Sequence, residues 1–274
     1  MRDGFYRQTT RVESVHWWFV HRRRLVAALI DGRVGEAAGR APRALDVGCG
    51  SGGNLEWLRR SGWFAVGVDR SALALELARA SHPHAVVLRA GAQGLSDCFR
   101  PASFSLVTVF NVLYHRWVTS EAEVLAAARR VLEPGGLLVL TEPAFGFLRR
   151  RHDDVDLGAR RYTRSELVRR VEGAGFAVLR SSYFNALAFG PALVLAGLDR
   201  LRPRRGSGRG DEETAEIAVP PPLINRTLLA LCTLERMWIA TVGRLPLGVG
   251  VIILARAPQA AEPAGGGPRG QVGT

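Results

Sequence analysis

The sequence predicts an α/β fold in which helices cover both faces of a doubly wound, mostly parallel sheet. Apolar runs without polar alternation recur between residues 44 and 142, and stretches with helical periodicity separate them. Strands buried on both faces read as continuous apolar runs, so this pattern indicates a parallel sheet between two layers of helices. A glycine-rich turn, Gly48 to Gly53, directly follows the first run. A strand, a glycine turn and a helix in this order can cradle a nucleotide, because the turn admits a close ligand and the helix presents free N–H groups.

The expected elements follow one another in a regular order. Strands are predicted at 44–47, 64–68, 85–88, 104–110 and 137–141, and helices at 54–61, 72–80 and 120–132. After a polar stretch, a helix is predicted at 163–172, where Thr163 and Glu166 have the spacing of a capping box. A sixth strand is expected at 176–179, a helix at 223–242 and a last strand at 248–255.

These elements divide the chain into five segments. Residues 1–42 are predicted to form an N-terminal helical cap, because apolar and aromatic residues from Val15 to Leu29 recur at helical spacing. This helix either lays its aromatic face on the core or covers the mouth of the active site. Residues 43–183 form the α/β core. The remaining segments are a helical insert at 184–247, a final core strand at 248–256 and a tail at 257–274 that is predicted to be disordered; the insert contains a flexible linker at 202–222 with few apolar residues.

Composition narrows the classes of function. The net charge is +12, and all 37 basic residues are arginine, scattered without an aromatic stripe, which argues against nucleic acid and leaves anionic acceptors open. The three cysteines, Cys49, Cys98 and Cys232, fit neither a disulfide framework nor a zinc site. No apolar leader follows Met1, and the longest apolar stretch, Phe184–Leu198, is shorter than the roughly 20 residues of a spanning helix. A cytoplasmic protein is therefore expected, with a peripheral position at the inner membrane face as the alternative.

The glycine turn fits two nucleotide-binding patterns. Gly48, Gly50 and Gly53 satisfy the dinucleotide pattern G-x-G-x-x-G. Gly48, Gly50 and Gly52 satisfy the pattern D-x-G-x-G-x-G of S-adenosylmethionine enzymes. Asp69, at the end of the second predicted strand, suits either ligand, because an acid there can accept both hydroxyls of a ribose. The glycines alone do not decide between the two.

Asp46 favours S-adenosylmethionine. A pyrophosphate on this turn would bring two negative charges close to the Asp46 carboxylate, which costs free energy in a partly buried site. The methionine end of S-adenosylmethionine instead brings an ammonium and a sulfonium group. The alternative is that Asp46 is solvated or paired within the core.

Five segments also carry a family resemblance. They are Leu45–Gly52, Gly67–Ser71, Phe104–Val107, Asn111–His115 and Val131–Gly136. Together, over about residues 44 to 180, the chain resembles class I S-adenosylmethionine-dependent methyltransferases of the bacterial type 11 and type 12 methyltransferase-domain group. His16–Phe19 with Arg22–Arg24, and His152–Asp153 with Arg160–Thr163, resemble a bacterial subgroup of these enzymes.

The resemblance implies a seven-stranded sheet of order 3-2-1-4-5-7-6 and S-adenosylmethionine as the cofactor, with S-adenosylhomocysteine as the product and no metal. By position, it implies that the cofactor is bound by Asp46, Gly48, Cys49, Gly50, Gly52, Asp69, Arg70, Gly91, Ala92 and Asn111. Asp46 would lie near the methionine amino group and Asp69 would hold the ribose hydroxyls. The chain departs from the family at Gly91, where relatives place an acid on the adenine. Either the backbone and Gln93 would substitute, or Asp97 would, or the affinity for the cofactor is reduced. Asn111 stands where relatives often carry aspartate.

Methyl transfer requires the enzyme mainly to position the reactants and exclude water. His115 follows the fourth predicted strand, where ligands bind in such folds, and its side chain suits a general base near neutral pH. A histidine that only caps the loop is the alternative. His152, with Asp153 and Asp154, is the second candidate base; the same trio could bind a metal or form a solvated loop. Tyr162 and Arg161 would hold an anionic acceptor or anchor their loop.

The expected function is transfer of a methyl group to a small-molecule or lipid- or glycan-linked acceptor. The alternatives are an NAD-dependent oxidoreductase and a non-catalytic scaffold with a methyltransferase-like fold. Phe184–Leu198, followed by Arg200 and three further arginines, also has the composition of a peripheral membrane anchor. The other interpretation is that this segment packs with residues 223–242 as a helical annex over the acceptor pocket.

Overall fold

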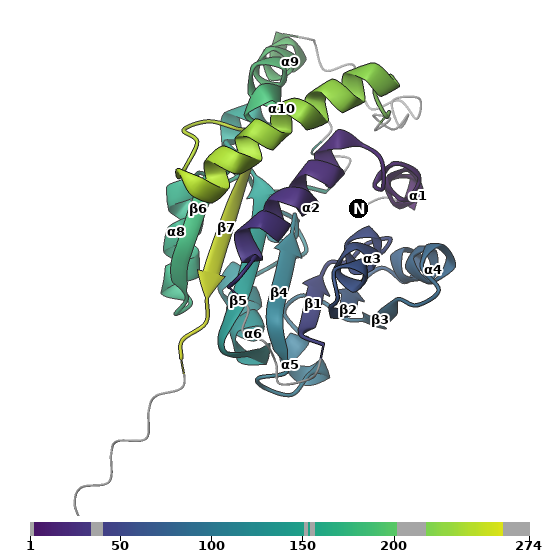
Figure 1. The fold of residues 1–274 in the computed structure, drawn as a ribbon, viewed down its shortest axis with the longest axis vertical. Coiled ribbons are helices and arrows are strands. Elements are labelled where there is room, and N and C mark those ends of the chain that lie inside the picture. The colour runs from purple at the N-terminus through teal and green to yellow at the C-terminus, as the bar shows by residue number, and fades with distance from the viewer. Residues whose placement is uncertain (1–2, 34–40, 151–152, 154–156, 202–217, 260–274) are drawn as a thin grey trace, which may run out of the picture.

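Seven strands form one sheet in the order β3-β2-β1-β4-β5-β7-β6 (Figure 1), which confirms the expected order. The computed structural model describes residues 3–33, 41–150, 153, 157–201 and 218–259. The strands are β1 Arg43–Val47, β2 Phe64–Asp69, β3 Val86–Arg89, β4 Phe104–Phe110, β5 Leu132–Pro143, β6 Ala177–Phe184 and β7 Gly250–Arg256. The first five pair in parallel, and β7 runs antiparallel between β5 and β6.

Helices cover both faces of this sheet. They are α1 Asp3–Val12, α2 Trp17–Ile30, α3 Gly53–Arg60, α4 Ala72–Ser81, α5 Leu95–Cys98, α6 Glu121–Val131, α8 Arg164–Gly173, α9 Phe189–Leu201 and α10 Pro222–Thr241, with short 3-10 turns η1 Gly146–Leu148 and η2 Ala186–Ala188. One apolar core lies between the sheet and α2, α3 and α10, and the other between the sheet and α5, α6 and α8. All seven residues of β4 are buried, as expected for a central strand with helices on both sides.

Local signals set most helix boundaries. Both hydrogen bonds of the capping box between Thr163 and Glu166 are present at the start of α8. The N-terminal segment, in contrast, forms two helices rather than one. His16 has an extended backbone and its ring nitrogen accepts a hydrogen bond from the Trp18 N–H at 3.2 Å, so α2 begins only at Trp17.

The helical insert packs on the N-terminal helices, and Ala188 and Ala192 of the insert line the cavity described below. α10 lies across α2 (Figure 1), where the Asn225 side chain accepts from the Trp17 N–H and donates to the Val15 carbonyl, both at 2.9 Å. α9 packs instead against η1 and η2. Phe184 is buried at the end of β6, so the expected surface segment 184–198 is only partly on the surface. Of the predicted linker and tail, residues 202–217 and 260–274 lie outside the described residues.

A buried carboxylate joins the insert to the N-terminal helices. Glu235 of α10 accepts from the His21 ring at 2.9 Å and from the backbone N–H groups of Asn185 and Ala186 at 2.6 and 2.8 Å. These bonds link α10 to α2 and to the end of β6, so the insert is fixed to the wall of the cavity described below. Within the described part of the chain, no helix has the combination of length and apolar character needed to cross a membrane.

Candidate functional site

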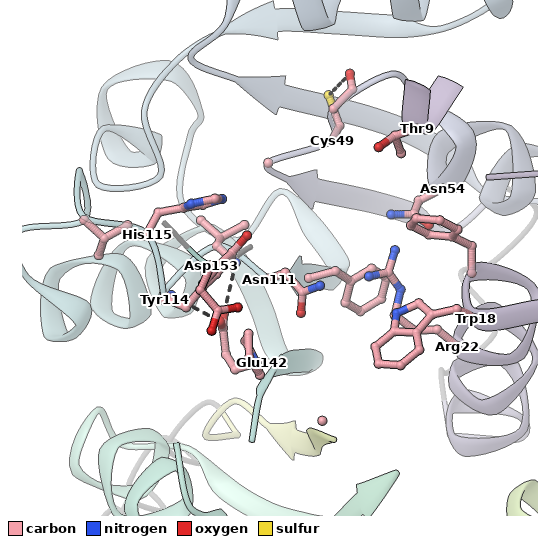
Figure 2. A pocket seen from close by; sticks show the side chains of 18 of the residues that line it. Thr9, Trp18, Arg22, Cys49, Asn54, Asn111, Tyr114, His115, Glu142 and Asp153 are labelled. Carbon is pink, nitrogen blue, oxygen red and sulfur yellow. Dashed lines mark hydrogen bonds between the residues drawn. The ribbon is translucent and has the colours of Figure 1, made fainter. Parts of the chain in front are cut away.

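A cavity of about 820 Å³ lies at the carboxyl ends of β1, β2, β4 and β5. The turn after β1 forms its floor, and residues of α1 and α2 form its roof. Figure 2 shows Arg22, Trp18 and Asn54 on one side, and Tyr114, His115, Glu142 and Asp153 on the other, with Asn111 between them. The volume suits a nucleotide and a small second ligand together.

The glycine turn is fixed by its own backbone. Gly48 and Cys49 donate N–H hydrogen bonds to the Val68 carbonyl at 2.8 and 3.0 Å, and the Gly50 N–H donates to an Asp69 carboxylate oxygen at 3.0 Å. Gly48 and Gly50 have φ of 73° and 54°, in the left-handed region that glycine adopts without strain. Gly48, Cys49 and Gly50 line the cavity, as the resemblance implies.

Gly52 does not line the cavity. Its φ is 89°, and a Cβ added there would lie 3.1 Å from Ala78 and from His82. The glycine therefore allows α3 to begin close against α4. Gly52 thus has a packing role in the protein, and its contact with the cofactor stays a prediction.

Replacement of Gly48 by alanine is expected to lower the free energy of unfolding by about 2 to 4 kcal/mol. The alanine would have to adopt a left-handed φ, and its Cβ would lie 2.5 Å from a methyl group of Val112. Gly62→Ala is the matched control, because Gly62 has φ of 87° and open space around the added Cβ. Urea unfolding should show a loss of only about 1 to 2 kcal/mol in that control; equal losses would mean that contact with Val112 does not restrict Gly48.

Asp46 also lies outside the cavity lining and is paired within the core, as the alternative prediction for it held. It is 1% exposed and accepts hydrogen bonds from the Thr108 hydroxyl at 2.6 Å and the Asn54 amide at 3.3 Å. Burial raises the pKa of Asp46 to about 6, although both hydrogen bonds oppose this shift. Asp46 thus orients Asn54, which does line the cavity.

Asp69 lies at the end of β2, where the ribose was expected. One of its oxygens accepts from the Gly50 N–H and the other from the Ser71 N–H at 2.9 Å, and each keeps capacity for a further donor. Burial raises the pKa of Asp69 above its ordinary value. Arg70 lines the cavity beside it, with its guanidinium 4.9 Å from the centre of the Trp117 ring.

Gly91, Ala92 and Gln93 line the cavity after β3, where the adenine was expected. An added Cβ at Gly91 would meet nothing within 4 Å, so the wall is open at this position. The Gln93 amide donates to Thr119 and Glu123 at 2.9 and 2.6 Å. Asp97 is not part of the lining, so Gln93 is the better placed of the two expected substitutes.

The roof contains charged residues that sequence reasoning missed. The Glu13 carboxylate accepts from the Ser51 hydroxyl at 2.8 Å and lies against Gly53, where a Cβ would overlap it. Burial raises the pKa of Glu13. The helical spacing of residues 15–29 predicted a helix here but did not show which residues face the turn.

Arg22 of α2 is a buried cation at the cavity. Its guanidinium lies 4.8 Å from the centre of the Phe110 ring and 5.7 Å from that of Phe19. Burial and the neighbouring Arg23 lower the pKa of Arg22 to about 10, which still leaves it charged at neutral pH. No described residue accepts a hydrogen bond from its Nε. An anion in the cavity would supply that acceptor.

Asn111 and Glu142 form the wall beyond the turn. Asn111 follows β4 with φ of 56°, a conformation that asparagine tolerates better than most residues. Glu142, at the end of β5, is fully buried. Its carboxyl group accepts hydrogen bonds from the N–H groups of the three residues that follow Asn111, which are Val112, Leu113 and Tyr114, at 3.0, 2.8 and 3.1 Å. Burial raises the pKa of Glu142 to about 8 despite these bonds. This carboxyl group fixes the turn that carries His115.

His115 lines the cavity with a ring that is packed between two aromatic neighbours. The ring centres lie 4.0 Å from Tyr114 and 3.9 Å from Trp117, and the residue is 4% exposed. The position agrees with both predictions for this histidine, a base and a structural residue. His152 lies outside the described residues.

Asp153 and its neighbours anchor their loop. Arg161 donates to both oxygens of Asp153 at 2.9 Å, and the buried Tyr162 hydroxyl donates to the Leu113 carbonyl at 3.1 Å. Arg161 also donates to the Ala144 carbonyl at 2.9 Å, so these contacts support its predicted anchoring role. Among the described residues, no three His, Cys, Asp or Glu side chains are placed to hold a metal ion.

Known proteins are similar to this chain in sequence. A family model described as a methyltransferase domain matches residues 45–140. A ubiquinone biosynthesis O-methyltransferase from Methylococcus capsulatus is 38% identical over 103 residues, which are 36% of this chain and 41% of that protein. The chain spans between 36% and 46% of the length of the curated relatives it matches.

Solved structures share the fold. A putative methyltransferase in complex with the Trm112 methyltransferase activator of Haloferax volcanii matches with a TM-score of 0.58 at 18% identity, over 95% of this chain and 97% of that chain. Phosphoethanolamine N-methyltransferase 2 of Haemonchus contortus, in complex with S-adenosyl-L-methionine, has a TM-score of 0.54 at 18% identity, over 86% of this chain and 52% of that one.

Proposed function

The chain carries a class I S-adenosylmethionine-dependent methyltransferase domain, and we propose that it is an enzyme that transfers a methyl group to a small acceptor held in the 820 Å³ cavity. S-adenosylhomocysteine would be the second product. The observation that carries the proposal is a set of polar atoms at the cavity that match the two ends of the cofactor.

The amino-acid end of the cofactor carries a carboxylate and an ammonium group. Among the described residues, the buried Nε of Arg22 has no acceptor and the buried Oδ1 of Asn54 has no donor. Both residues line the cavity and lie on the same side of it (Figure 2). Arg22 would hold the carboxylate, and Asn54, fixed by Asp46, would accept from the ammonium. Unpaired buried polar atoms are costly, so a ligand that pairs both gains free energy.

The nucleoside end requires acceptors for a ribose diol. Asp69 supplies two oxygens at the end of β2 and is held by the Gly50 and Ser71 N–H groups. The open wall at Gly91 leaves room for the base. Gly48, Cys49 and Gly50 would contact the cofactor through their backbone.

When bound, S-adenosylmethionine supplies an electrophilic methyl group on a sulfonium. The protein's own contribution is to bind the reactants in line and to exclude water. Trp18, Phe19 and Phe184 give the cavity apolar walls, and Asn111 lies between its two sides. These walls support an acceptor with an apolar portion, which a lipid-linked molecule would have, and the surrounding arginines support an anionic one.

We propose that His115 accepts the acceptor's proton. The support is its position in the cavity wall and the rings that fix its orientation. His115→Ala is expected to lower methyl transfer by about 100-fold or more and to leave the affinity for S-adenosylmethionine nearly unchanged. Transfer is measured with methyl-labelled S-adenosylmethionine and a small-molecule extract. A matching loss of cofactor affinity would assign His115 to structure alone.

The same labelled reaction tests the function itself. Incorporation of label into a component of the extract is the expected result. Cofactor binding without any transfer to small-molecule, lipid or glycan fractions would favour the non-catalytic scaffold. We also propose a cytoplasmic location, which the free thiol of the exposed Cys98 supports.

A further inference from the structure

α10 has two apolar faces, and the protein covers only one of them. Its inner face contacts α2 and contains the buried residues Cys232, Glu235 and Ile239. Its outer face consists of Leu223, Ile224, Leu231, Leu234, Met237 and Trp238, which are between 42% and 78% exposed. These residues recur at helical spacing and so share one side of the helix. Figure 1 shows α10 on the outside of the molecule, with α2 beneath it.

An uncovered face of this kind is unusual on a protein surrounded by water. Monomers seldom expose contiguous apolar faces, and those that do use them to contact proteins or membranes. The segments outside the described residues offer little to cover it, because residues 202–217 contain only Ala215 and Ile217 as apolar side chains. A partner from outside the chain is therefore required.

The charges near this face indicate whether a second copy of the chain or an anionic lipid surface binds it. Arg226 of α10 and Arg244, which follows the helix, are exposed, whereas the single acid of α10, Glu235, is buried and bonded to His21, Asn185 and Ala186. A second copy of the chain would bring arginine against arginine here, with no exposed acid on α10 to pair with them. Anionic lipid headgroups complement the arginines, and the acyl region of a bilayer receives the apolar side chains.

We propose that the outer face of α10 docks the protein on an anionic lipid bilayer. Trp238 and the leucines would enter the boundary between headgroups and acyl chains, and Arg226 and Arg244 would contact the phosphates. This assignment adds to the predicted contact at Phe184–Leu198, where Phe184 is buried but Leu193, Val194, Leu195 and Leu198 are between 42% and 62% exposed. The contact is peripheral, and it places the methyltransferase cavity near a membrane surface.

The test is flotation of the full chain with phosphatidylcholine vesicles, with and without phosphatidylglycerol, at low and high salt. We expect binding to the anionic vesicles that weakens in high salt. Leu234→Glu with Trp238→Glu should lower this binding by at least about tenfold. Val86→Glu is the control, since Val86 is 46% exposed on β3, at the opposite edge of the sheet, and should bind like the parent.

A second variant tests the proposal independently, in case the first variant does not fold. Arg226→Gln with Arg244→Gln keeps the apolar face and should lower binding by about fivefold for each charge removed. Any of three results would overturn the proposal. They are absence of binding to anionic vesicles, equal binding to neutral vesicles, and a dimer in analytical ultracentrifugation that Leu234→Glu with Trp238→Glu abolishes. Vesicle binding is read without cofactor or acceptor, so its outcome is independent of the proposed methyl transfer.

Discussion

Replacement of Arg22 by alanine is expected to weaken S-adenosylmethionine binding by about 100-fold, or about 2.7 kcal/mol. The reason is the loss of a buried guanidinium whose Nε has no acceptor among the described residues and which would pair with the methionine carboxylate. Arg24→Ala is the matched control on the same helix, because Arg24 is exposed and should leave the affinity unchanged.

A truncated ligand separates this role from a structural one. 5′-Methylthioadenosine keeps the base and the ribose but lacks the amino-acid end, so its affinity should be the same for the parent and for Arg22→Ala. Isothermal titration calorimetry of both proteins with both ligands gives four affinities, and their comparison isolates the effect of Arg22 on the amino-acid end. If the substitution weakened both ligands equally, Arg22 would act on the shape of the cavity and not on the carboxylate.

Replacement of Glu142 by alanine is expected to lower the free energy of unfolding by about 3 to 5 kcal/mol. The substitution leaves three buried N–H groups without their acceptor, those of Val112, Leu113 and Tyr114. It should also loosen the turn that carries His115. Glu172→Ala, at an exposed position of α8, is the control and should change stability by less than about 0.5 kcal/mol.

The same carboxyl group predicts a pH dependence. In the folded protein the pKa of Glu142 is about 8, above its ordinary value of 4.5, so the folded state holds the proton through a range in which the unfolded chain has lost it. Stability contributed by this group is therefore present below about pH 4.5 and is lost as the pH rises toward 8. The slope is up to about 1.4 kcal/mol per pH unit.

Glu142→Gln isolates this effect. Urea unfolding of the parent and of the variant between pH 5 and pH 8 should show that the parent's free energy of unfolding falls relative to that of the variant as the pH rises. A constant difference between the two proteins across this range would mean that Glu142 is ionised in the folded state throughout.

The sheet and its nucleotide turn could be predicted from sequence because their signals are local. Buried parallel strands read as continuous apolar runs, and the positive φ of Gly48 and Gly50 requires glycine. The same signals could not separate Gly50, which faces the cavity, from Gly52, which faces α4. Both are glycines in one motif, and only the position of α4 distinguishes them.

The roles of the charged residues, in contrast, could not be predicted from local sequence signals. The contact of Asp46 with the ligand was expected from its charge and its position in the motif, whereas Thr108, 62 residues away, and Asn54 enclose it in the core. Arg22 could not be recognised because helical spacing does not say which side of α2 meets the turn. That orientation depends on α10, which is joined to α2 through residues more than 200 positions apart, such as Trp17 and Asn225.

Glu142 was missed for a related reason. An acid at the end of an apolar strand is a common sequence feature, and nothing nearby indicates that its two oxygens meet three N–H groups from the loop after β4. Such a contact appears only when two parallel strands end side by side. The roles of residues at this edge of the sheet can therefore be assigned only from the structure.

Titration of the purified protein with S-adenosylmethionine, S-adenosylhomocysteine and NAD tests the assignment of the cavity most directly. Isothermal calorimetry should show binding of both methionine nucleotides and none of NAD, because Arg22 and Asn54 would pair with the two charged groups of the methionine end and Asp69 would pair with the ribose. Binding of NAD without either methionine nucleotide would contradict the assignment.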